Sequence, residues 1–226
     1  GIRTATMYLS AEELGKRRPG NIRWILSGCM RYSVLCSGTI ATAIYLLAPW
    51  LAENWIGNPF VTDAIRLYAA FLPVNCLCGV MVGYFTGAQR IGTLAAVEVA
   101  EQLFSMVCTV ILLTVWAGTD AVRSCQAVIL GSGMGACLTL SCLMILRLRE
   151  RIPSGPRIPV AQRLMNVALP LAAADDLKTG INTVENLMVP KRLALYSGVT
   201  SPLAAFGIVS GMVFPVLMFP ACILYG

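Results

Sequence analysis

Long apolar runs constrain this chain more than any other feature of its sequence. A helix rises about 1.5 Å per residue, so about 20 apolar residues cover the roughly 30 Å hydrocarbon layer of a bilayer. Runs of that length occur at residues 25–49, 65–89, 94–116, 124–146, 164–188 and 203–224. Lipid offers the backbone no hydrogen-bond partners, and the runs are far too long for barrel strands. We therefore predict an all-α, polytopic transmembrane bundle with six spans in this chain.

The composition agrees with a membrane protein and excludes several other classes. Apolar residues make up 57% of the chain and charged residues only 12%, which is far from the balance of soluble domains. The sequence has no histidine and no CxxC pair, so zinc sites of the Cys/His type and triads with an imidazole base are excluded. We expect buried, apolar cysteines, no metal site, no cofactor and no enzymatic activity.

Positive charge gathers in alternate connections between the runs. One set comprises Arg3, Lys16, Arg17, Arg18, Arg23, Arg90, Arg147, Arg149, Arg151, Arg157 and Arg163, and the opposite set only Arg123, Lys191 and Arg192. Because basic residues are retained on the cytoplasmic side, we predict a multi-pass protein of the plasma membrane with residues 1–24 and 147–163 in the cytoplasm. Arg31 and Arg66, near run ends, are expected to snorkel outward. The net charge of +6 follows from this topology, and we expect no nucleic-acid partner.

The fourth connection is rich in residues that break helices. Its sequence, RLRERIPSGPRIPVAQR at residues 147–163, contains three prolines and a glycine. We predict that it joins two helical lobes, with residues 1–146 in the N-terminal lobe and residues 164–226 at the start of the C-terminal lobe. Because the chain opens at Gly1 and stops at Gly226 within an apolar run, we expect a fragment whose missing helices belong to the same protein.

Glycines at four-residue spacing mark the faces on which the helices are expected to pack, because small residues let membrane helices approach closely. They are Gly79, Gly83 and Gly87 in the second run, Gly131 and Gly135 in the fourth, and Gly207 and Gly211 in the sixth. We therefore predict that at least these three helices pack tightly into a bundle.

The fifth run carries a polar stripe that a helix surrounded by lipid could not hold. At about 100° per residue, one side of the helix presents Asp175, Lys178, Asn182, Glu185 and Asn186, with Asp176 at its edge. A charge at bilayer depth costs about 2.5–3.5 kcal/mol, so we predict that these candidate site residues line a hydrophilic cavity. In the alternative, Asp175 and Lys178 form an ion pair inside a sealed polar core.

Two further groups of polar residues are expected to be structural. Glu98, Glu101 and Gln102 share a face at the start of the third run, where the positive end of the helix dipole favours acids without any function. Lys191 and Arg192 follow Pro190 at the far interface and are expected to anchor the helix end.

Four segments, taken in order, resemble a known family. They are GIRTATMYLSAEELGKRRPG at the start, GYFTGAQR closing the second run, ENLMVPKRL after the polar stripe and FGIVSGMVFPVLMFPACILYG at the end. Together they resemble the oligosaccharide flippases of the multidrug/oligosaccharidyl-lipid/polysaccharide exporter superfamily. The likeness is closest to polysaccharide biosynthesis membrane proteins of the stage V sporulation protein B group. It implies about 12 to 14 helices in two lobes, with residues 1–146 resembling helices three to six and residues 164–226 helices seven and eight.

The resemblance also implies a function. The protein is expected to translocate a lipid-linked oligosaccharide, or a cell-wall or polysaccharide precursor, by alternating access during envelope or spore synthesis. Its partners would be the bilayer and the lipid-linked sugar. Whether transport is coupled to H⁺ or Na⁺ is left open. Two alternatives remain. One is a cation-coupled multidrug exporter of the same superfamily, in which Asp175 or Glu185 carries the ion, and the other is a nonconducting scaffold for envelope or spore synthesis.

Overall fold

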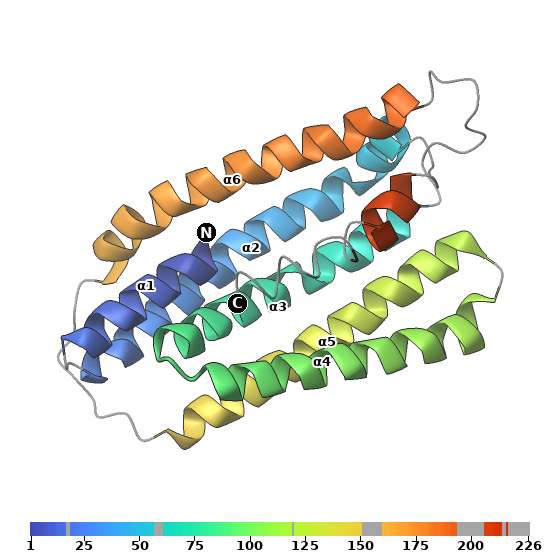
Figure 1. Ribbon diagram of the computed structural model, residues 1–226. Helices are drawn as coiled ribbons and strands as arrows, with labels where there is room; N and C mark the ends of the chain where they lie inside the picture. The colour runs from blue at the N-terminus through green and yellow to red at the C-terminus, as the bar shows by residue number, and fades with distance from the viewer. Residues whose placement is uncertain are drawn as a thin grey trace. The chain divides into compact units, whose positions relative to one another are not determined.

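All regular secondary structure in the described residues is helical, with short turns between the helices (Figure 1). The computed structural model describes residues 1–16, 19–56, 61–118, 120–150, 160–193, 206–213 and 216. The chain forms two compact units, Gly1–Ala172 and Ala173–Gly226. The predicted all-α class is confirmed in these ranges. The predicted connection between two lobes falls largely outside them, at residues 151–159.

Six long helices account for most of the described chain. They are α1 (Ile2–Gly15), α2 (Ile22–Leu51), α3 (Thr62–Gly87), α4 (Ile91–Leu112), α5 (Ala121–Arg149) and α6 (Val160–Leu193). A short 3₁₀ turn, η1 (Pro19–Asn21), precedes α2, and π-helical turns extend α2 and α4 as η2 (Ala52–Ile56) and η4 (Leu113–Ala117). In the second unit, a further π-helical turn, η5, covers Val209–Val213.

Four of the described helices are long and apolar enough to cross a membrane. They are Ile22–Asn54, Thr62–Gly87, Ile91–Trp116 and Val122–Arg149, and they coincide with the first four predicted runs. The fifth run lies in α6, which is helical as expected but is not among these four. Its crossing of a membrane therefore stays a prediction. Most of the sixth run, 203–224, lies outside the described residues.

The core of the first unit is organised around α3, which packs against α1, α2 and α5, while α4 packs mainly against α5. Leu9 of α1, Ile25 of α2, Phe85 of α3 and Leu143 of α5 are almost completely buried in this core. Because lipid tails are as apolar as these side chains, helix association in a membrane depends on close packing and dispersion rather than on hydrophobic transfer.

Glycines provide that close packing in the first unit, as their spacing predicted. A Cβ atom built at Gly83 would lie 2.3 Å from the carbonyl oxygen of Arg3, and one at Gly87 would lie 2.6 Å from that of Met7, so the backbone of α1 rests directly on α3. Similarly, Gly131 and Gly135 of α5 lie against side chains of α4. In the second unit, nothing in the described structure lies within 4 Å of a Cβ at Gly207 or Gly211, so the packing predicted through these two glycines stays a prediction.

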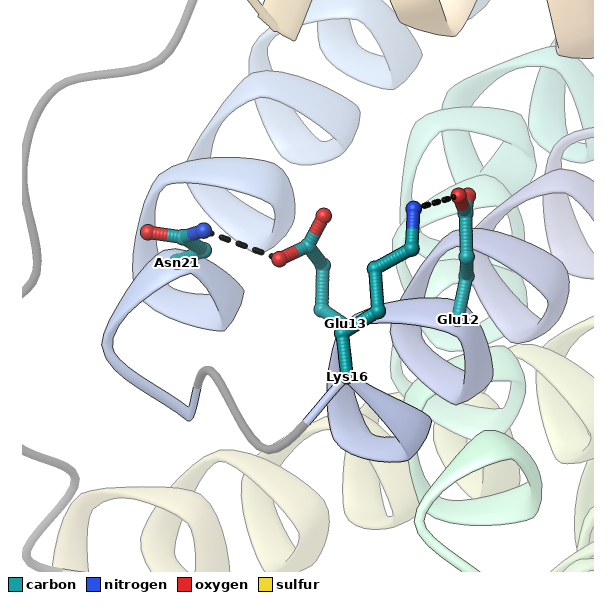
Figure 2. A network of polar contacts seen from close by, with 4 residues as sticks. All are labelled: Glu12, Glu13, Lys16 and Asn21. Atoms are coloured by element: carbon teal, nitrogen blue, oxygen red, sulfur yellow. Dashed lines mark hydrogen bonds and ion pairs between the residues drawn. The ribbon is translucent and has the colours of Figure 1, made fainter.

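Polar contacts fix the connection between α1 and α2 (Figure 2). The Nδ2 of Asn21, in η1, donates a hydrogen bond of 2.8 Å to the Oε2 of Glu13, whose side chain is almost completely buried. Lys16 forms an ion pair with Glu12 one turn earlier. Both carboxylates lie near the C-terminal end of α1, where the helix dipole disfavours negative charge. Their partners offset this cost and fix the way the chain leaves α1.

Candidate functional site

The polar stripe predicted from the sequence lies on α6, in the second unit. The side chains of Asp175, Lys178, Asn182 and Glu185 are all exposed there. Asp176 and Asn186 also belong to α6, but their side chains lie outside the described structure. Apolar residues on the opposite side of the helix, including Leu177 and Ile181, are exposed as well. The cavity-lining role of the stripe and the alternative ion pair therefore both stay predictions.

Within the stripe, threonine hydroxyls are already satisfied by the backbone of the helix. The Oγ1 of Thr179 donates to the carbonyl oxygen of Asp175, and the Oγ1 of Thr183 donates to that of Thr179, both at 2.8 Å. These bonds are local to α6 and leave the amide of Asn182 and the carboxylate of Glu185 as exposed hydrogen-bonding groups on the same helix. Groups of this kind can bind sugar hydroxyls or a small cation.

A second candidate site, which the sequence did not predict, is a cavity of about 450 Å³ in the first unit. Its size falls within the usual range for small-molecule sites. The lining comes from the beginning of α2, the later part of α3 and the end of α5: Arg23, Leu26, Ser27, Met30, Arg31, Met81, Met144, Arg147, Leu148 and Glu150. We refer to it as the arginine cavity.

Glu150, the one carboxylate among the described lining residues, is held by partners outside the cavity lining. The hydroxyl of Tyr84 donates a hydrogen bond of 2.7 Å to the Oε2 of Glu150, and the Nη1 of Arg90 forms an ion pair with the Oε1 of the same residue. Only 12% of the Glu150 side chain is exposed. Its negative charge is therefore balanced mainly by Arg90, which is not among the residues that line the cavity.

Arg147 faces the same cavity with an incomplete set of partners. Its guanidinium carbon lies 5.2 Å from the centroid of the Tyr84 ring, in a cation–π contact. Its Nε is buried without a hydrogen-bond partner among the described residues. Nor does any carboxylate in the described part of the chain form an ion pair with Arg23, Arg31 or Arg147. The cavity can therefore attract an anion.

A tight turn between α3 and α4 places Arg90 beside the end of α5. The backbone N–H of Gln89 donates to the carbonyl oxygen of Thr86, and that of Arg90 donates to the carbonyl oxygen of Phe85, both at 3.0 Å, as in a Schellman-type helix end. Such an end requires a left-handed residue, and Gln89 adopts this conformation with a φ of 57°. The turn thus sets up the pairing of Arg90 with Glu150.

The arginine cavity was not predicted from the sequence, because membrane topology already accounted for its arginines. Arg23 and Arg147 lie far apart in the sequence, and both satisfied the rule that basic residues mark one side of a membrane. Arg31 was expected only to snorkel, whereas it lines the cavity. Arg31 lies nine residues after the start of α2, about 14 Å along the helix. This depth was the one feature of the sequence that pointed to a role for Arg31 other than at the end of the span.

Glu101 also lies in a different setting from the one predicted. Since α4 begins at Ile91, Glu101 lies ten residues into the helix, beyond the reach of the helix dipole that was expected to explain it. Instead, its Oε2 accepts a hydrogen bond from the hydroxyl of Thr139 on α5, next to Gly135. The structural role expected for Glu101 therefore has a different basis, which is a contact between α4 and α5.

Comparisons with known proteins give one match. A family model described as "Polysaccharide biosynthesis protein" matches residues 25–198, a range that begins in the first turn of α2 and includes the polar stripe of α6 and every lining residue of the arginine cavity except Arg23. Searches of curated proteins and of solved structures found no significant match.

Proposed function

The chain belongs to the polysaccharide biosynthesis protein family, and from this premise we propose that it is part of a flippase for a lipid-linked oligosaccharide or a related polysaccharide precursor. Four apolar helices of membrane-spanning length support a role within the bilayer. Flipping makes and breaks no covalent bond, so the proposal includes neither enzymatic chemistry nor a cofactor. Among the members of the family, we propose a relationship to the stage V sporulation protein B group.

We infer a multi-pass arrangement in the plasma membrane from the distribution of basic residues. The end of the first unit at which α2 begins and α5 finishes carries Arg23, Arg90, Arg147 and Arg149, and it is assigned to the cytoplasm. The opposite end carries Arg66 and Arg123, each within 4 Å of an aspartate three residues earlier. With two of these arginines against four, that end is the poorer in basic residues, which supports the same orientation.

The observation that carries the proposal is the charged and amide-bearing side of α6. Asp175, Lys178, Asn182 and Glu185 are spread over three helical turns and are all exposed within their unit. Polar groups on a helix at bilayer depth are costly unless they face protein or water, and such groups characteristically mark substrate pathways. We propose that they bind the sugar hydroxyls as the head group passes between two lobes in alternating access.

A flipping assay on the full-length protein tests this proposal. The protein is reconstituted in liposomes with a fluorescent lipid-linked oligosaccharide, and a membrane-impermeant quencher reports the label in the outer leaflet. We expect Asp175→Asn combined with Glu185→Gln to slow flipping about tenfold, since each lost hydrogen bond is worth about 0.5–1.5 kcal/mol. Glu98→Gln removes an exposed carboxylate from α4 and serves as the matched control.

Two results would contradict the proposal. Undiminished flipping by the double variant would show that the stripe does not take part in transport. Efflux of organic cations driven by a pH or sodium gradient, without flipping of the lipid-linked sugar, would favour a multidrug exporter in which Asp175 or Glu185 carries the ion.

A further inference from the structure

Three arginine side chains of the first unit line one cavity, and no carboxylate among the described residues forms an ion pair with them. Arg23 and Arg31 come from α2 and Arg147 from the last turn of α5. In the described structure none of them belongs to an ion pair, and the buried Nε of Arg147 lacks a hydrogen-bond partner. Cations gathered in this way repel one another and are costly near hydrocarbon, so an anion bound among them would be strongly stabilised.

Glu150, which also lines the cavity, does not supply this anion. Its two carboxylate oxygens are bound by Tyr84 and Arg90, which hold it at the end of α5. Because Arg90 balances the charge of Glu150, the three guanidinium groups retain a net positive potential in the cavity. An anionic ligand would therefore complement the cavity without competing for the contacts of Glu150.

Apart from Ser27, the remaining lining residues of the cavity are apolar. Leu26, Met30, Met81, Met144 and Leu148 lie beside the arginines. Methionine side chains are flexible and polarisable, so they adapt to chains of varied shape. From Arg23, at the second position of α2, to Arg31 the lining extends about 12 Å along the helix, from its end toward the hydrocarbon layer. The ligand that fits combines a negative head with an apolar chain.

We propose that the arginine cavity binds the anionic phosphate head group of a lipid in the leaflet next to the beginning of α2. Guanidinium groups bind phosphate oxygens in pairs of hydrogen bonds, and basic pockets between membrane helices suit such head groups. The first methylenes of the lipid chain lie against the methionines. Anionic phospholipids and isoprenyl pyrophosphates share this chemistry, whereas inorganic phosphate lacks the chain. The site does not depend on the proposed flipping activity.

Lipid binding to the full-length protein tests the site directly. The protein is placed in nanodiscs that contain phosphatidylcholine with increasing phosphatidylglycerol, and retained lipids are counted by native mass spectrometry. We expect retention of phosphatidylglycerol over phosphatidylcholine, with a loss of about tenfold in affinity for each of Arg23→Gln and Arg31→Gln. Both side chains are exposed, so the fold is retained, which circular dichroism verifies. Arg123→Gln, at the opposite end of α5 and near Asp120, is the matched control.

Two competition arms identify the source of the phosphate. Displacement of bound phosphatidylglycerol by an isoprenyl pyrophosphate would assign the cavity to a transport substrate, and retention of the phospholipid would assign it to a resident lipid; either result supports the site. Displacement by inorganic phosphate at similar concentrations would overturn the role of the methionine walls. Equal binding of the two phospholipids, or equal losses in the cavity variants and in Arg123→Gln, would overturn the proposal.

Discussion

The contact between α1 and α3 leads to a prediction that one pair of substitutions can test. Gly79 and Gly83 lie one turn apart on α3, yet a Cβ atom at Gly79 would have its nearest neighbour 3.9 Å away, at the Cβ of Arg3. A Cβ at Gly83 would lie 2.3 Å from the carbonyl oxygen of Arg3 and 3.2 Å from the backbone nitrogen of Met7. These atoms belong to the backbone of α1, so they cannot move aside as a flexible side chain would.

The expected magnitudes follow from this difference. Alanine is a better helix former than glycine by about 1 kcal/mol at either position, so this term cancels when Gly79→Ala and Gly83→Ala are compared. Overpacking typically costs about 1–3 kcal/mol, and a clash with backbone belongs at the upper end of that range. We therefore expect Gly83→Ala to be less stable than Gly79→Ala by about 3 kcal/mol, and Gly79→Ala to be no less stable than the unmodified protein.

Equilibrium unfolding of the full-length protein in mixed micelles, followed by circular dichroism, measures this difference. The expected difference in stability depends on the position of α1 rather than on the number of glycines in α3, because both variants lose one glycine from the same helix. Equal stability of Gly79→Ala and Gly83→Ala would show that α1 does not rest on α3 at this point. Cross-linking of cysteines introduced at both helices would then locate the actual neighbour of α3.

Three further predictions concern single polar or strained residues, and the same unfolding assay measures each of them. Glu150→Gln should destabilise the protein by about 1.5–3 kcal/mol, because it removes the charge that Arg90 and the Tyr84 hydroxyl bind. Unchanged stability would show that these contacts of Glu150 do not stabilise the fold. Thr139→Val should cost about 1–3 kcal/mol by leaving a carboxylate of α4 without its donor, whereas unchanged stability would contradict that contact. Gln89→Gly should stabilise the turn by up to about 1 kcal/mol, since φ is 57° there, and a loss of stability would refute this origin of strain.

The sequence predicted the helices well because a membrane segment must satisfy its backbone within itself. Hydropathy and length therefore identify a span without knowledge of its neighbours, and four predicted runs coincide with observed helices. Glycine spacing predicted part of the helix packing. It indicated which side of α3 is in close contact, yet it could not show that the partner is α1, whose mixed sequence was assigned to the segment before the first span.

Side-chain partners from distant segments were beyond reach of the sequence. The hydrogen bond from Thr139 to Glu101 depends on how α5 is rotated against α4, and no periodicity in either helix specifies that rotation. The polar stripe of α6 illustrates the opposite case. Its residues are neighbours on one helix, so helical periodicity alone groups them on one side. Whether that side faces a cavity or a sealed polar core depends on other parts of the protein.

The two ends of the first unit differ in how their arginines are paired. At one end, Arg66 lies 3.9 Å from Asp63 and Arg123 lies 3.4 Å from Asp120, so each arginine has a carboxylate three residues away on its own helix. At the other end, the carboxylate of Glu150 is bound by Arg90, from the turn between α3 and α4. That pairing leaves the arginines of the cavity without a counter-ion among the described residues. Backbone hydrogen bonds fix the turn, and the turn places Arg90 beside Glu150. The positive electrostatic potential of the cavity therefore depends on how α3 ends as much as on the number of arginines.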